Sequence, residues 1–265
     1  DWACKVCKFP SDKCIAANAD LTTEKNEINL IRLITRIMFV WFIKQKNLIP
    51  TWIFNKNELA EILTDADLTS DKKGNYYNAV LQNLFFGALN KKIEERAFAE
   101  VSKAGVANEQ YGIKTYFRDA NEGSFFKCSP KEMVQKFLDV PFLNGGLFEC
   151  LDWDEPIKNN TSHKVHYVDG FSRDKDRRAF VPNILFWNED EKQPGLITIL
   201  SRYNFTVEES TPSDVQVALD PELLGKVFEN LLDVKDRKSK GAFYTPREIV
   251  HYMCQETLIN HLVTK

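Results

Sequence analysis

Hydrophobic residues recur at helical spacing along much of the chain, and the clearest example is the stretch from Thr23 to Lys46. Its most apolar run, Ile37 to Ile43, is flanked by Arg36 and Lys44. That run is much shorter than the roughly 20 apolar residues that a membrane-spanning helix needs. We therefore expect a helix over this stretch, buried on most sides from Glu27 onward, and no membrane span.

Shorter segments with the same pattern predict further helices at Lys56–Leu63, Tyr76–Ala88 and Ser129–Phe137. In the last, Ser129 is placed as the N-cap, Pro130 as the first helical residue and Glu132 as the partner that closes a capping box. The paired aromatics Tyr76-Tyr77 and Phe85-Phe86 are interpreted as core residues rather than as base-stacking ones, since large aromatics are usually buried.

The second half of the chain carries weaker signals. Alternation predicts a short strand within Thr161–Val168, and Asn144-Gly145-Gly146 predicts a turn over Pro141–Glu149. Leu196–Leu200 is short and apolar, whereas Asp220-Pro221 begins a helix predicted to end near Leu232. The expected fold class is mainly α, a helical segment with a few short strands and long loops.

The expected organisation follows these signals along the chain. A linker remnant is expected at 1–20, a helical domain at 21–150, and a mixed, loop-rich region with short strands at 151–219. Residues 220–240 are expected to form a helix and a basic connector, and 241–265 the start of a further domain.

The overall charge limits where nucleic acid could bind. A net charge of −3 excludes a strongly basic binding protein, so any DNA contact must be local. The connector from Asp233 to Gly241 has a formal charge of four minus two, or +2, and we hold a surface linker and a phosphate contact about equal for it. Its candidate DNA-contacting residues are Lys235, Arg237, Lys238 and Lys240.

Other charged residues favour structural roles. Arg32 and Arg36 lie four apart and share a helix face, which is more often solvated or salt-bridged than bound to DNA. The mixed-charge run Arg173–Arg178 is interpreted as a solvated loop, with phosphate contact as the less favoured alternative.

The candidate metal ligands in the sequence do not form a complete set. Cys4 and Cys7 have the spacing of a zinc knuckle and Cys14 offers a third ligand, but structural zinc needs four. Ordinary reduced thiols are the preferred interpretation, with zinc binding left open. His163 and His166 lie three apart without a convincing third ligand, so no metal site is predicted.

The C-terminal stretch has the most specific pattern. Thr245 is placed as an N-cap, Pro246 as the first helical residue and Glu248 as the capping-box partner. An apolar stripe follows at Ile249, Val250, Met253, Cys254, Thr257 and Leu258. The N-terminus of such a helix suits an anionic group, and a purely structural helix start is an equally good interpretation.

Gly241 to Pro246 also resembles the Gly-x-Phe-Tyr-Thr-Pro element that precedes the catalytic domain of gamma-type N6-adenine DNA methyltransferases, including the fused type IIG and type IIS restriction–modification enzymes. Further segments are similar to that family in the same order: Asn29–Pro50, Leu84–Phe86, Val140–Glu149, Tyr203–Glu208 and Asp220–Glu229. The resemblance implies that Phe243, Tyr244, Thr245 and Pro246 bind S-adenosyl-L-methionine.

The resemblance further implies methyl transfer to adenine N6 in double-stranded DNA, with the target base flipped out of the duplex. The family's Asn-Pro-Pro-Tyr or Asp-Pro-Pro-Tyr tetrapeptide and its glycine-rich cofactor loop are not found in this sequence. We therefore expect no catalytic residue in this segment, no activity of the segment alone, and a longer cytoplasmic parent whose methyltransferase domain begins near residue 241. In the fused family a nuclease lies N-terminal to this region.

Two other functions stay open at this point. The segment can be a non-catalytic coupling or DNA-contacting module of a restriction–modification or phage-defence complex, or an interaction scaffold with no nucleic-acid role. An Asn-Pro-Pro-Tyr element in sequence downstream of Lys265 would separate the enzyme from the scaffold.

Overall fold

The computed structural model describes residues 2–11, 18–98, 116–120, 123–143, 146–157, 162–202, 205–206, 217–218, 245 and 247–264. The chain divides into two compact units, Asp1–Tyr203 and Asn204–Lys265. The described part of the first unit is built mainly from helices, which confirms the mainly α fold class.

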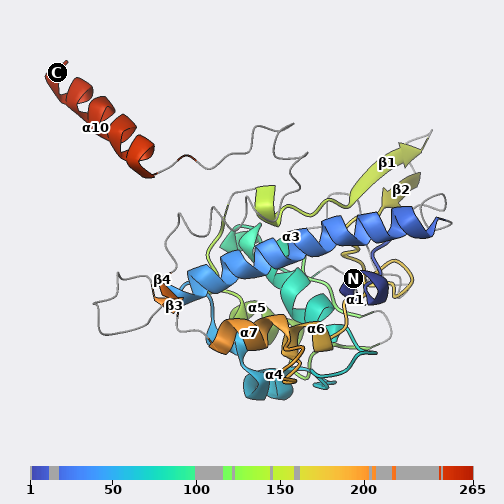
Figure 1. Ribbon diagram of the computed structural model, residues 1–265. Coiled ribbons are helices and arrows are strands. Elements are labelled where there is room, and N and C mark those ends of the chain that lie inside the picture. The colour runs from blue at the N-terminus through green and yellow to red at the C-terminus, as the bar shows by residue number, and fades with distance from the viewer. Residues whose placement is uncertain are drawn as a thin grey trace. The chain divides into compact units, whose positions relative to one another are not determined.

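The longest helix of the first unit is α3, Ala19–Gln45, which crosses the unit in Figure 1. It begins four residues earlier than predicted because the Asn18 side chain accepts hydrogen bonds from the backbone N–H groups of Asp20 and Leu21. It ends at Gln45 with Lys46 as its C-cap, and Asn47, just beyond, has the left-handed φ of 56° that reverses the chain. Its buried face includes Leu33, Ile37, Val40 and Trp41.

The centre of the unit is a helical stretch of π type, η2 (Tyr76–Leu81) and η3 (Asn83–Leu89), in which every residue is buried. The predicted core role of Tyr76, Tyr77, Phe85 and Phe86 is confirmed, since each is at most 1% exposed. The buried amides of this stretch bond to the backbone of distant segments; Gln82 Nε2, for example, donates to the Asp169 carbonyl at 2.9 Å.

Shorter helices surround this stretch. They are α1 (Trp2–Val6), η1 (Thr51–Phe54), α4 (Lys56–Ile62), η4 (Ile93–Glu95), α5 (Pro130–Lys136), η5 (Gly146–Phe148), α6 (Ile184–Trp187) and α7 (Leu196–Arg202). The predicted capping box between Ser129 and Glu132 is present at the start of α5. Gly146 begins η5, whereas Asn144 and Gly145 of the predicted turn lie outside the described residues.

The N-terminal residues belong to the core, contrary to the linker expected at 1–20. Helix α1 packs against α3, and Cys7 and Phe9 are buried. The Asn26 side-chain amide donates to the carbonyls of Cys4 and Cys7 at 2.9 and 3.0 Å. Residues 2–11 are therefore part of the first unit.

Strands are few among the described residues. In the first unit β1 (Trp153–Ile157) and β2 (Ser162–His166) form an antiparallel hairpin that extends from the packed helices in Figure 1. The strand predicted within Thr161–Val168 is β2. The second unit contains the parallel pair β3 (Phe205–Thr206) and β4 (Val217–Ala218) and the helix α10 (Arg247–Val263).

Of two further predictions, the one on membrane spans can be compared with the described residues and the one on the helix at 220–232 cannot. No helix in the described ranges is long and apolar enough to cross a membrane. The helix predicted over Asp220–Leu232 lies outside the described residues.

Candidate functional site

A buried ionic cluster joins α3 to the base of the β1–β2 hairpin in the first unit. The Asp169 Oδ1 atom accepts hydrogen bonds from Arg32 Nη2 and Arg36 Nη1, both at 3.0 Å. Its Oδ2 atom accepts from the Leu151 backbone N–H at 2.8 Å. The side chains of Asp169 and Arg36 are 3% and 4% exposed. The prediction that the Arg32–Arg36 face is solvated or salt-bridged is therefore confirmed.

Arg36 also joins α3 to the segment that precedes the hairpin. Its Nε donates to the Leu147 carbonyl at 2.8 Å and its Nη2 to the Glu149 carbonyl at 3.0 Å. Its guanidinium lies 4.9 Å from the centroid of the Phe86 ring, within cation–π range. With these partners, the arginine is a positioning group for the backbone at 147–149.

A second carboxylate, that of Asp152, joins the cluster through hydrogen bonds from backbone N–H groups. Asp152 accepts hydrogen bonds from the N–H groups of Val168, Asp169 and Gly170 at Oδ1, and from that of Phe171 at Oδ2, over 2.7–3.1 Å. It thereby closes the base of the hairpin. No sequence pattern indicates this pair of aspartates, because residues 17 apart meet here only through the hairpin.

The two carboxyl groups differ in acidity. Burial disfavours the charged form of Asp169, but the guanidinium groups of Arg36 and Arg32 outweigh it, so its pKa lies below the ordinary value. Burial raises the pKa of Asp152, against the backbone hydrogen bonds that lower it. Both carboxyl groups are held by several donors, which suits a structural clamp rather than acid–base chemistry on a substrate.

His163 and His166, three apart in the sequence, both lie on β2, and the side chain of His163 lies outside what the structure describes. His166 stacks on Trp153 with ring centroids 4.1 Å apart, and its Nε2 lies 3.0 Å from Glu155 Oε2. Within the described ranges, no three His, Cys, Asp or Glu residues gather as metal ligands.

The N-terminal cysteines lie close together but differ in environment. Cys4 is partly exposed within α1, whereas Cys7 is 1% exposed. Burial, and then the neighbouring Cys4, raise the pKa of Cys7 to about 12. Such a thiol stays protonated at neutral pH. Cys14, the third candidate ligand, lies outside the described residues.

The predicted cofactor residues are described only in part. Thr245 is exposed and lies two residues before the start of α10, while Phe243, Tyr244 and Pro246 lie outside the described residues. Glu248 is in the first turn of α10, so its pairing with Thr245 in a capping box stays a prediction. The candidate DNA-contacting residues Lys235, Arg237, Lys238 and Lys240 also lie outside the described residues.

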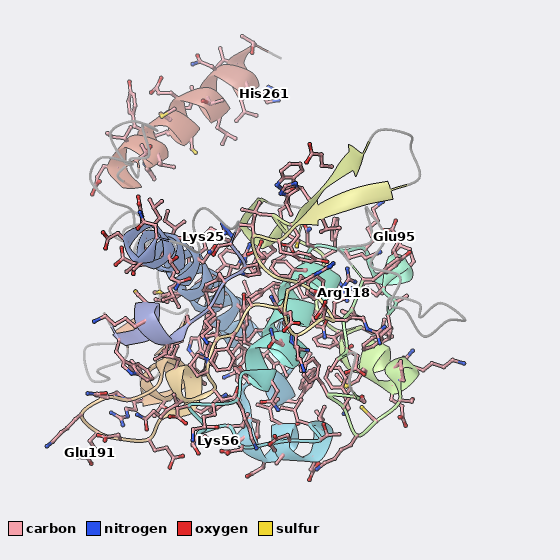
Figure 2. All side chains as sticks on the ribbon, turned by 90° about the vertical axis from the view of Figure 1, so that its right-hand side faces the viewer. Lys25, Lys56, Glu95, Arg118, Glu191 and His261 are labelled. Atoms are coloured by element: carbon pink, nitrogen blue, oxygen red, sulfur yellow. The ribbon has the colours of Figure 1, made fainter. Side chains whose placement is uncertain are left out.

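Figure 2 shows how densely side chains fill the interior of the first unit. Arg118, which it labels, is 4% exposed and lies 4.7 Å from the centroid of the Phe171 ring. Lys56 and Glu191, also labelled, are on the outside of the unit. The buried cations of this unit are therefore part of its packing.

One comparison with known proteins gives a relative. The chain is 27% identical over 263 residues to a protein of Methanocaldococcus jannaschii named "Putative type II restriction enzyme and methyltransferase RM.MjaORFECS2P". The match covers 97% of this chain and 16% of that protein. No family model matches the chain, and no solved structure matches it. The similarity supports a relationship to restriction–modification proteins, whereas the gamma-type adenine assignment stays a prediction.

Proposed function

We propose that the chain is a segment of a restriction–modification enzyme that transfers a methyl group from S-adenosyl-L-methionine to adenine N6 in DNA. The observation that carries the proposal is the similarity over 97% of the chain to a protein named as a restriction enzyme and methyltransferase. The motif from Gly241 to Pro246 supports the adenine specificity through its family resemblance. The chain spans 16% of that relative, so the activity is proposed for a longer protein.

The C-terminal residues are assigned the cofactor contact. Thr245 is exposed immediately ahead of a helix of 17 residues, so its hydroxyl is accessible to a ligand. The N-terminus of a helix this long favours an anionic group, such as the carboxylate of the cofactor's methionine part. Phe243 and Tyr244 would supply apolar contact, and the cofactor would supply a methyl group on a sulfonium.

The first unit is assigned a supporting role. This unit contains the ionic cluster of Arg32, Arg36, Asp152 and Asp169. The side chains of the cluster form hydrogen bonds with each other and with the backbone. A rigid helical body of this kind suits the positioning of DNA against a neighbouring methyltransferase domain, because positioning accounts for much of the catalytic power in such transfers. None of the cluster is assigned to the chemical step.

The proposal is tested with the longer protein that contains this segment. After incubation with S-adenosyl-L-methionine and duplex DNA, nucleoside mass spectrometry should detect N6-methyladenine. Methylation found on cytosine instead would refute the adenine assignment while keeping the restriction–modification one. The absence of any methylated base, with the cofactor bound, would refute the enzyme activity.

The assignment of Thr245 has its own test. Thr245→Val keeps the shape of the side chain but removes the hydroxyl, whereas Thr245→Ser keeps the hydroxyl and is the matched control. Loss of a hydrogen bond to a charged ligand costs about 1.5–3 kcal/mol, or roughly ten- to hundredfold in affinity. Calorimetry on the longer protein should show that loss for valine and a small change for serine. Equal affinity of wild type and Thr245→Val, with circular dichroism unchanged, would leave the threonine a structural residue.

A further inference from the structure

A pocket of about 350 Å³ lies in the first unit, where three segments meet. One segment is the loop between α4 and η2, the second is the mixed-charge loop after the hairpin, and the third contributes Phe125. Lys72 and Lys73 come from the first of these loops, and Lys175 and Arg178 from the second. The fold thus joins two basic stretches that are a hundred residues apart in the sequence.

The pocket is strongly cationic for this protein. Four basic side chains line it against one acidic side chain, Asp65, so its formal charge is four minus one, or +3. The whole chain carries −3. Lys73 Nζ lies 2.7 Å from Asp65 Oδ2 and 3.9 Å from Asp67 Oδ2, but all three side chains are more than two-fifths exposed, so solvent screens their attraction. These exposed pairs therefore do not cancel the excess of basic side chains in the lining.

The walls of the pocket are held by backbone contacts. The Lys73 carbonyl accepts from the Asn183 N–H at 2.7 Å, and a Cβ added at Gly74 would lie 2.8 Å from the Val181 carbonyl oxygen. In the other loop, the Asp174 carbonyl accepts from the Arg178 N–H at 2.9 Å. The two loops are therefore fixed close to each other before any ligand arrives, which lowers the entropic cost of binding.

Aromatic groups form the apolar part of the lining. Phe125 and Phe180 are half-buried, and the Arg178 guanidinium lies 5.0 Å from the centroid of the Phe125 ring. This stacking fixes the plane of the guanidinium, which favours oriented recognition of a phosphate. Lys72, Lys73 and Lys175 are exposed, so the charge is accessible from outside.

We propose that this pocket binds phosphate, and that the phosphate belongs to the backbone of DNA. Lysines and an arginine converge on a pocket with more room than a single carboxylate needs. Such a convergence is typical of phosphate recognition. Exposed lysines at the rim can be reached by a polymer. The choice of DNA as the source of the phosphate rests on the proposed function, whereas the phosphate chemistry rests on the pocket alone.

The test compares two double variants of the 265-residue chain with equal loss of charge. Lys72→Gln/Lys175→Gln removes two exposed cations of the pocket. Lys46→Gln/Lys192→Gln removes two exposed cations that do not line it. Binding of fluorescein-labelled duplex DNA is followed by anisotropy over a series of salt concentrations. In parallel, inorganic phosphate is titrated into ¹⁵N-labelled chain while the amide signals of Gly74 and Arg178 are followed by NMR.

The pocket variant should bind DNA about tenfold more weakly at low salt, with the slope of log affinity against log salt reduced by about 1.8, or 0.9 for each lost contact. The surface variant should change much less. Equal losses in the two variants, or no loss in either, would overturn the DNA assignment. Phosphate-dependent shifts at Gly74 and Arg178 without a difference in DNA binding would support the pocket and make a free phosphate compound its ligand. Absence of both effects would overturn the proposal.

These outcomes are separate from those of the methylation assay. A longer protein that methylates adenine but keeps its DNA affinity when Lys72 and Lys175 are replaced would retain the proposed function and lose this site. A protein that fails to methylate but shows the predicted salt dependence would retain the site.

Discussion

The carboxylate of Asp169 is almost closed to water and binds two guanidinium groups, that of Arg36, which is buried, and that of Arg32, which is partly exposed. The side chain of Asp169 is 3% exposed, and that of Arg36 is 4% exposed. We expect Asp169→Asn to lower the free energy of unfolding by about 3–5 kcal/mol, because removal of one partner leaves a buried charge uncompensated. Urea denaturation at neutral pH measures the loss. Asp65→Asn, which breaks an exposed pair with Lys73, is the control and should cost much less.

The pH dependence of stability gives a second measure of the same carboxylate. Its pKa is lowered in the folded state, so its ion pairs contribute fully above the unfolded pKa of about 3.9 and are lost as pH falls through the folded value. Asp152 has a raised pKa, so its effect on the pH dependence of stability has the opposite sign. It is present in both the wild type and Asp169→Asn. Stability should therefore fall less on acidification in Asp169→Asn than in wild type. An unchanged acid dependence would show that folding does not lower the pKa of Asp169.

At the scale of elements, the buried π-type helix depends on a glycine. A Cβ added at Gly87 would lie 2.2 Å from Cδ1 of the Phe117 ring, inside any allowed contact. We expect Gly87→Ala to destabilise the protein by about 1–3 kcal/mol, the usual cost of overpacking a core. Thermal unfolding measures it. Gly146→Ala is the control, because an added Cβ there meets no atom within 4 Å. Similar melting temperatures for the two variants would mean that the Phe117 ring moves aside at little cost.

The observed elements also show which sequence signals are sufficient to predict a helix or a strand. Local chemistry predicted α5, because Ser129 and Glu132 bond to each other within one turn. It could not predict that Tyr76–Ala88 is of π type, because hydrophobic spacing does not distinguish helix types over so short a stretch. Strand β1 was missed because it contains Pro156, which reads as a strand breaker although it is tolerated in an edge strand.

At the scale of the whole molecule, the sequence does not reveal which residues far apart along the chain come into contact. The Arg32–Arg36 face was recognised from its spacing, but its partner Asp169 lies more than 130 residues away. The basic pocket is of the same kind: Lys72–Lys73 and Lys175–Arg178 carry ordinary surface charge until the fold brings them together. The resemblance of Gly241–Pro246 to a methyltransferase element required no fold, but its cofactor role remains a prediction.

The distribution of buried residues leads to a prediction about the first unit. Among the described residues, every buried apolar side chain lies between Cys7 and Leu200, within the unit Asp1–Tyr203. A chain ended after Tyr203 therefore retains this core, and its melting temperature should lie within about 2 °C of that of the 265-residue chain, equivalent to less than about 1 kcal/mol. Near-ultraviolet circular dichroism should show the same aromatic signal in both. A large drop in melting temperature, or loss of that signal, would show that residues 204–265 complete the core of the first unit.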